Sequence, residues 1–235
     1  DDANAESERP TVIIGKTIMG KGCVLANADM YEGECELHGK PIGDTKADFK
    51  QTLINLGANP ESSFDIYEDV QAYYTEVLAK KAAAAAVKKA TIASWKTANA
   101  ALSQKMEMFL SGVLPDLDLS QVVQKANVAT REASSAVLGY LAENLENVIV
   151  SSADLSNSDK TDGFLKKTTV LQKNNFKGAF LQAGVAELTM TAIANGIALH
   201  GGVVPVVATF FVFSDYMKPA IRLAAIQELP VKYVL

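Results

Sequence analysis

The most strongly apolar stretch of the chain runs from residue 184 to residue 216, and its pattern changes partway along. Residues 186–198 are mostly helix formers, with Gly184 before them and a pair of glycines soon after, which predicts one buried helix. Residues 203–213 are β-branched and aromatic, which predicts a strand buried on both faces. A buried helix followed by a buried strand is the unit of a parallel sheet, so we expect an α/β fold.

Three other apolar runs predict strands. Residues 10–17 have the pattern of a buried strand, and residues 147–150 that of a short strand leading into a polar loop. Residues 229–235 have the composition of a last strand, at the point where the printed sequence stops. Residues 161–178 carry several lysines and are predicted to form a solvated basic loop.

Two helical regions flank a predicted domain boundary. Residues 44–110 and residues 120–144 both have helical patterns, apart from an Asn-Pro loop within the first region. Residues 111–118 combine Gly, Pro and Asp between these regions, as interdomain linkers do. We therefore divide the chain into residues 1–112 and residues 113–235.

Composition places the chain among globular proteins and excludes several classes of partner. Its 235 residues are 49% hydrophobic and 21% charged, which excludes disordered and collagen-like classes. A net charge of -5 provides no basic field for nucleic acid or anionic lipid. No apolar run reaches the roughly 18 residues that a membrane helix needs, because Pro205, Ser214 and Asp215 interrupt the best candidate. Two cysteines without histidines at metal-ligand spacing suit a reducing cytoplasm.

The first turn of the predicted helix carries a lone carboxylate, Glu187, and aromatic rings follow at residues 210, 211, 213 and 216. An ionised side chain in so apolar a run needs a partner. One interpretation is that Glu187 is stabilised by the helix dipole and that the rings belong to the core. The other is that Glu187 faces a ligand that stacks on the rings. Periodicity alone favours the first interpretation.

Four further polar residues are candidates for a binding site. His38 lies among Gly and Pro, where it is either a surface histidine or a rigidly held donor. Arg131 is either an exposed helix charge or, with Ser158, an anion site, because a guanidinium and a hydroxyl together satisfy phosphate oxygens. Asp154 and Ser158 follow a predicted strand, where they are either turn formers or ligand contacts.

Five separated motifs occur over roughly the whole chain. They are Lys-Thr-Ile-x-Gly-x-Gly from Lys16, His-Gly-x-Pro from His38, Arg-x-Ala-Ser from Arg131, Ser-Ala-Asp-Leu from Ser152, and a central run that includes residues 184–187, 190–202 and 209–216. Together these motifs resemble transketolase. Within the central run many members have Arg-Glu-Phe or Arg-Glu-His, whereas this chain has Ala186-Glu187-Leu188 and keeps the glutamate.

The resemblance implies a fold, a cofactor and a reaction. It implies the parallel-sheet thiamin diphosphate-binding fold, with residues 1–112 as the end of the diphosphate-binding domain plus a helical region, and residues 113–235 as an incomplete pyrimidine-binding domain. It implies thiamin diphosphate with Mg²⁺ as cofactors and transfer of a two-carbon ketol unit from a ketose phosphate to an aldose phosphate. It also implies sugar phosphate substrates and a homodimer, with each site formed between two subunits.

The resemblance also implies roles for individual residues near the cofactor. Glu187 would bond a ring nitrogen of the aminopyrimidine and so act in catalysis. Phe210, Phe213 and Tyr216 would form the wall on which the pyrimidine stacks. Asp154 would lie near the thiazolium ring.

Three residues are implied to act on the substrate or the diphosphate. His38 would meet the cofactor diphosphate and the substrate, and Arg131 would bind the sugar phosphate with the help of Ser158. The His38 motif and the pairing of Arg131 with Ser158 favour transketolase over two sister enzymes, deoxyxylulose phosphate synthase and dihydroxyacetone synthase. A non-catalytic assembly module that kept the fold is the third reading.

Two motifs of the family do not occur in the printed sequence. They are the Gly-Asp-Gly motif for metal and diphosphate and the Thr-His-Asp loop with the Asp-Gly-Pro-Thr-His run that follows it. We therefore expect a central fragment whose Mg²⁺ ligands lie outside this chain and which has negligible turnover alone.

Overall fold

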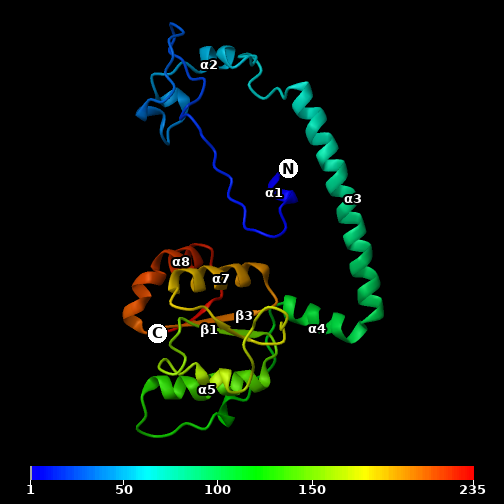
Figure 1. The fold of residues 1–235 in the computed structure, drawn as a ribbon, viewed down its shortest axis with the longest axis vertical. Coiled ribbons are helices and arrows are strands. Elements are labelled where there is room, and N and C mark those ends of the chain that lie inside the picture. The colour runs from blue at the N-terminus through cyan, green and yellow to red at the C-terminus, as the bar shows by residue number, and fades with distance from the viewer. Residues whose placement is uncertain (1) are drawn as a thin grey trace. The chain divides into compact units, whose positions relative to one another are not determined.

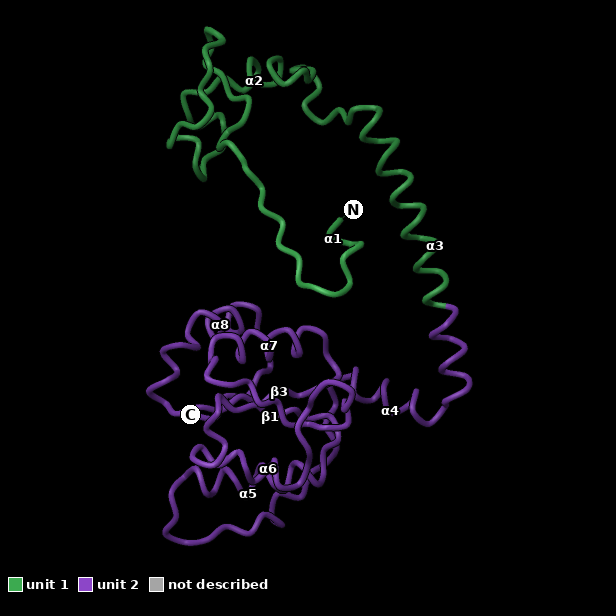
Figure 2. Tube along the Cα trace, in the orientation of Figure 1, with its two compact units in different colours: residues 1–89 green, residues 90–235 purple. Residues whose placement is uncertain are grey.

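The computed structural model describes residues 2–235, which form two compact units (Figure 2). The first unit comprises residues 1–89 and the second residues 90–235. In the described part of the first unit no segment is a strand. Its helices are α1 (Asp2–Ala5), the 3₁₀ turns η1 (Cys35–Leu37) and η2 (Ile42–Asp44), α2 (Phe49–Asn55), and most of α3 (Glu68–Ala98).

The prediction of a buried strand at residues 10–17 was wrong. Residues 11–18 have no regular secondary structure, and Val12, Ile13 and Ile14 are 81%, 82% and 82% exposed. A strand is stable only beside another strand that pairs its backbone groups. The pairings of the described strands involve residues 148–234 and do not include residues 10–17.

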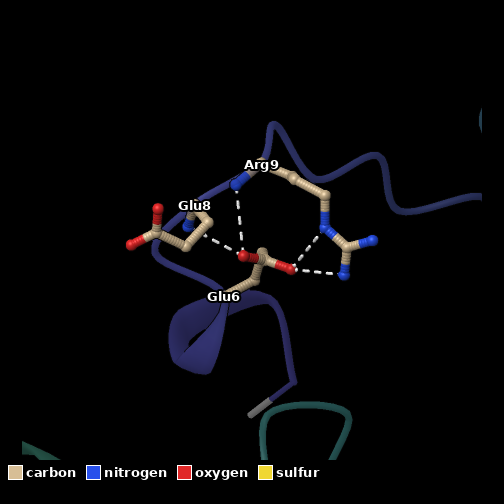
Figure 3. A network of polar contacts seen from close by, with 3 residues as sticks. All are labelled: Glu6, Glu8 and Arg9. Atoms are coloured by element: carbon tan, nitrogen blue, oxygen red, sulfur yellow. Dashed lines mark hydrogen bonds and ion pairs between the residues drawn. The ribbon is translucent and has the colours of Figure 1, made fainter.

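The acidic start of the chain forms a small polar network around Glu6 (Figure 3). The backbone N–H groups of Glu8 and Arg9 donate to Oε1 of Glu6 at 2.8 and 3.1 Å, and the Arg9 guanidinium donates to Oε2 at 3.0 and 2.8 Å. The Glu8 N–H and then the Arg9 contacts lower the pKa of Glu6. Most of residues 2–10 are exposed, and Asp1 lies outside the described residues.

The second unit contains a parallel sheet of four strands in the order β2-β1-β3-β4. This confirms the parallel α/β prediction. The predicted strand at residues 203–213 is shorter than expected, since it ends at Ala208. The strands are β1 (Val148–Ser152), β2 (Phe180–Gln182), β3 (Val204–Ala208) and β4 (Lys232–Val234).

Helices cover both faces of the sheet, α7 and α8 on one side and α5 on the other (Figure 1). The predicted helix at residues 120–144 begins ten residues late, at Thr130, and the long helical region at residues 44–110 is broken at Asn99. The helices that lie in the second unit are α4 (Ala100–Leu110), η3 (Leu119–Gln121), α5 (Thr130–Asn144), α6 (Asp162–Leu165), α7 (Glu187–His200), η4 (Phe211–Phe213) and α8 (Ser214–Ile226).

Each face of the sheet has its own hydrophobic core. Neighbouring residues of β3 serve opposite faces, because side chains alternate along a strand: Val206 belongs to one core and Val207 to the other. The first core joins the sheet to α5 and α6 through Leu138 and Phe164. The second joins it to α7 and α8 through Met190 and Met217. In the described part of the chain no helix is long and apolar enough to cross a membrane.

Candidate functional site

The candidate site lies where the order of the strands reverses. The chain passes from β1 to β2 on one side and later returns to place β3 on the other side of β1. In open parallel sheets this switch point opens a crevice beyond the carboxyl ends of the strands. β1 ends at Ser152 and β3 at Ala208, so the residues that follow them, Ala153 onward and Thr209 onward, lie at this edge.

Glu187 reaches the same edge as the first residue of α7, the helix that follows β2. Gly184, three residues earlier, has φ +68°, a left-handed conformation that glycine adopts without steric cost and that turns the chain into the helix. Glu187 is only 7% exposed. The hydroxyl of Thr209 donates to its Oε1 at 3.4 Å, a long hydrogen bond across two elements. A buried carboxylate with one weak side-chain donor is thus held at a helix N-terminus.

Three aromatic rings form a stacked row beside this carboxylate. The centroids of Phe210 and Phe213 are 6.2 Å apart and those of Phe213 and Tyr216 are 6.3 Å apart, with interplanar angles of 28° and 25°. The row exists because residues 210–216 are not a strand. Phe210 is extended, a turn closed by the Phe213 N–H donating to the Phe210 carbonyl at 2.8 Å follows it, and the chain continues through η4 into α8. The turn and the helix bring rings three residues apart together. Phe211 lies outside the row and is 75% exposed.

Four of the predicted site residues line one cavity of about 600 Å³: Asp154, Glu187, Phe213 and Tyr216. This volume falls within the range of small-ligand pockets. The remaining lining is mostly apolar and comes from Ala153, Leu155, Val185, Ala186, Leu188 and Thr189. The arrangement offers a flat apolar wall, a buried carboxylate and a second carboxylate at the end of β1.

Asp154 has an unusual backbone conformation at this cavity. It is exposed and has φ +66°, in the left-handed region that non-glycine residues seldom adopt. Such conformations cost of order 1–3 kcal/mol and persist where the surrounding structure fixes them.

Arg131 and Phe210 line a second cavity, of about 380 Å³, together with Asp159 and Thr209. The two cavities share structural elements, because Thr209 bonds Glu187 and Phe210 stacks on Phe213. Within residues 2–235 no acidic side chain forms an ion pair with Arg131, which is an exposed residue. Ser158 is not among the residues that line either cavity, and its Oγ donates to Oδ1 of Asn157 at 3.3 Å.

Three residues of this site carry no role in the sequence analysis: Ser152, Asp159 and Thr209. Asp159 is 5% exposed and Thr209 is 1% exposed. A short-range signal existed for Asp159, since an Asp two residues before a Thr commonly accepts local backbone and hydroxyl hydrogen bonds. No local pattern links Thr209 to Glu187, because the two are brought together by the sheet.

His38 belongs to the first unit, where it is exposed between η1 and η2. Its loop is braced by Tyr31, whose hydroxyl donates to Oε2 of Glu36 at 2.5 Å. This hydrogen bond is the main cause that raises the pKa of Tyr31 to about 12, and desolvation adds to it. The same hydrogen bond lowers the pKa of Glu36, against an opposing effect of desolvation. The role of His38 remains a prediction.

No cluster of three or more His, Cys, Asp or Glu side chains suited to a metal ion occurs among residues 2–235. Both cysteines are free; Cys23 is buried and Cys35 exposed. The His, Cys, Asp and Glu side chains of residues 2–235 therefore do not fit a metal site made by the described chain alone.

Two family models together match most of the chain. The one described as "Transketolase, thiamine diphosphate binding domain" matches residues 1–115, and the one described as "Transketolase, pyrimidine binding domain" matches residues 126–235. Transketolase from Halalkalibacterium halodurans is 37% identical over 100% of this chain and 34% of its own length. Transketolase from Geobacillus stearothermophilus is 35% identical with the same coverage. The chain therefore spans about a third of the length of these relatives.

Solved structures agree with the sequence relatives. Transketolase from Leishmania mexicana matches 99% of this chain and 34% of its own, with a TM-score of 0.81 and 27% identity. Transketolase from Pichia stipitis in complex with sedoheptulose-7-phosphate matches the same shares, with a TM-score of 0.78 and 29% identity.

Proposed function

The chain belongs to the transketolase family, and on this premise we propose that it binds the pyrimidine end of thiamin diphosphate and the phosphate group of a sugar substrate. The observation that carries the proposal is the meeting of Glu187, Phe213 and Tyr216 around one cavity at the switch point of the sheet.

The residues present fit the aminopyrimidine half of this cofactor. A flat, weakly basic heterocycle needs an apolar surface for its faces and a hydrogen-bonding group at its edge. The stacked row supplies the surface and Glu187 supplies the edge group, in a cavity of about 600 Å³. When bound, thiamin diphosphate supplies the electron-accepting centre for transfer of a two-carbon ketol unit between sugar phosphates.

Glu187 is proposed to hold a proton in a hydrogen bond between its carboxyl group and a ring nitrogen of the aminopyrimidine. Because its side chain is 7% exposed, water competes little for this hydrogen bond. The Thr209 hydroxyl, bonded to Oε1 at 3.4 Å, orients the carboxyl group and leaves its other oxygen for the ligand. Asp154, at the same cavity, is proposed to lie near the thiazolium ring.

Arg131 is proposed to bind the substrate phosphate. A guanidinium offers two parallel donors that match phosphate oxygens, and this guanidinium lines the cavity next to the aromatic row. The Pichia stipitis relative is described in complex with a sugar phosphate, which supports this class of substrate. Ser158 is proposed to assist Arg131, and His38 to contact the diphosphate and the substrate.

The remaining parts of the site are proposed to come from outside this chain. They are Mg²⁺ with its ligands and a second copy of the protein. The assembled protein is proposed to act in the cytoplasm. Exposed side chains in and next to the aromatic row support a covering partner: Tyr216 of the row is 63% exposed, and Phe211 and Val212 are 75% and 66% exposed.

A ketol-transfer assay of the polypeptide that carries this chain tests the proposal. Glu187→Gln keeps the shape and removes the acid, so we expect kcat to fall by about 10²–10⁴-fold, the usual contribution of a positioned proton-transfer group. The chain alone, assayed with thiamin diphosphate and Mg²⁺, is expected to give negligible transfer.

The matched control is Glu146→Gln, whose side chain is 69% exposed and pairs only with Lys105 among the described residues. It is expected to retain the full rate. A Glu187→Gln enzyme as fast as this control would contradict the proposal.

A further inference from the structure

A buried carboxylate beside the site has no role in the proposed function. Asp159 is 5% exposed and lines the same cavity as Arg131. Its carboxylate accepts three hydrogen bonds: from Ser152 Oγ at 2.7 Å, from Thr161 N at 2.9 Å and from Thr161 Oγ1 at 2.8 Å. Burial of an ionised group is costly, and here the cost is offset by three donors rather than by an ion pair.

Ser152 extends these contacts into the loop that carries Asp154. Ser152 is the last residue of β1 and is 2% exposed. Its hydroxyl donates to Asp159 and at the same time accepts from the backbone N–H of Leu155 at 3.2 Å. The carboxylate of Asp159 is thus connected, through one hydroxyl, to the residue directly after Asp154.

Backbone hydrogen bonds close the loop on itself. The N–H groups of Ser158 and Asp159 both donate to the carbonyl of Leu155, at 2.7 and 2.8 Å. Asp154 therefore lies between two fixed points, the end of β1 and the bonded Leu155. These fixed points hold it at φ +66°, a conformation that an unrestrained aspartate would leave.

We infer that Asp159 is a positioning residue: through Ser152 it holds Asp154 in its left-handed conformation at the mouth of the 600 Å³ cavity. The inference rests on the proposed function for the identity of the ligand, thiamin diphosphate. It adds a residue that acts on the cofactor site through its hydrogen bond to Ser152, without contacting the ligand. The same loop begins beside one cavity at Asp154 and ends beside the other at Asp159.

Four variants separate the steps of this connection. Asp159→Ala removes all three hydrogen bonds, whereas Ser152→Ala removes the link to Leu155 and leaves the Thr161 bonds in place. Asp159→Asn is the conservative variant, because its amide oxygen still accepts from Thr161 and its NH₂ group donates to Ser152 Oγ. Ser151→Ala is the matched control: Ser151 is also 2% exposed, and its Oγ has no hydrogen-bond partner among the described residues.

Two readouts are measured on each variant: amide hydrogen exchange at Leu155 and Thr161, and the dissociation constant of thiamin diphosphate with Mg²⁺ by calorimetry. In Asp159→Ala we expect both amides to exchange faster and the dissociation constant to rise, each by about 10–100-fold, as for a buried donor that loses its acceptor. In Ser152→Ala we expect faster amide exchange at Leu155 and a higher dissociation constant, while amide exchange at Thr161 stays unchanged. Asp159→Asn is expected to restore both readouts toward the wild-type values.

The inference is overturned if folded Asp159→Ala matches Ser151→Ala in Leu155 exchange and in cofactor affinity. If Asp159→Ala does not fold, Ser152→Ala decides by the same comparison. A wild-type protein that binds no thiamin diphosphate would count against the proposed function, while Leu155 exchange would still test whether Asp159 anchors the loop.

Discussion

At the scale of single residues, the site contains polar groups that form few hydrogen bonds with the rest of the chain. Glu187 is buried with one long hydrogen bond, and Asp154 keeps a strained backbone. Local misfits of this kind concentrate at functional sites, where a ligand completes what the protein leaves open. Asp159 is the opposite case, a buried carboxylate whose two oxygens accept three hydrogen bonds within the chain.

Tyr31 and Glu36 give a residue-scale prediction in the loop before His38. The fold raises the pKa of Tyr31 to about 12, so it favours the protonated hydroxyl. The resulting stabilisation is complete below the ordinary pKa of 10.0 and is lost as the pH rises through about 12. The pKa of Glu36 is lowered, so the folded state favours its ionised carboxylate. The stabilisation from Glu36 is present above its ordinary pKa of 4.5 and is lost as the pH falls through the lowered pKa.

Tyrosinate absorbance during alkaline titration checks this pair. We expect one late-titrating tyrosine to disappear in Tyr31→Phe and to titrate at a lower pH in Glu36→Gln than in the wild-type protein, because the accepting charge is gone. Equal titration curves for Glu36→Gln and the wild-type protein would show that the hydrogen bond does not set the Tyr31 pKa.

At the scale of elements, the helix α7 joins the core to the site. Its first residue, Glu187, faces the cavity, and three residues later Met190 is 0% exposed between the sheet and α8. Packing of Met190 therefore fixes the axis along which Glu187 is presented. Asn195 adds a polar tie, donating from Nδ2 to the carbonyl of Ala220 in α8 at 2.9 Å.

Truncation of Met190 measures how much this element depends on its core. We expect Met190→Ala to lower the free energy of unfolding by about 2–5 kcal/mol, through lost burial and the cavity left behind. Chemical denaturation monitored by circular dichroism gives the value. Leu199→Ala on the same helix is the control, because Leu199 is 61% exposed and its loss should cost much less. Similar losses in the two variants would refute the packing assigned to α7.

The elements also show what the sequence can and cannot predict. The presence of a helix and of parallel strands follows from composition and period. The expected burial of the whole helix was wrong: α7 buries one face, and Leu188, Ile193 and Leu199 are 48%, 42% and 61% exposed. The end of β3 at Ala208 did not follow, since aromatic residues suit strands as well as helical turns. Their spacing at residues 210, 213 and 216 was the missed signal, because side chains three residues apart lie on opposite faces of a strand but on the same side of a turn or helix.

At the scale of the whole molecule, the described chain divides into two units, and most of the predicted site falls in the second. Seven of the eight predicted residues lie there, and four of these line one cavity. The strand order β2-β1-β3-β4, which creates the switch point, could not be predicted because it depends on pairings between distant segments. The strand expected at residues 10–17 failed for a related reason, since a strand forms only with a neighbour.

The central claim is that the crevice beyond β1 and β3 binds the pyrimidine end of thiamin diphosphate. The most direct test is a titration of the polypeptide that carries this chain with thiamin diphosphate and Mg²⁺, followed by two-dimensional amide NMR. The account predicts shifts concentrated at Asp154, Glu187, Leu188 and Phe213, with Gly201 and Gly202 at the other end of α7 unchanged. No saturable shift at the first group, or larger shifts at the two glycines, would contradict it.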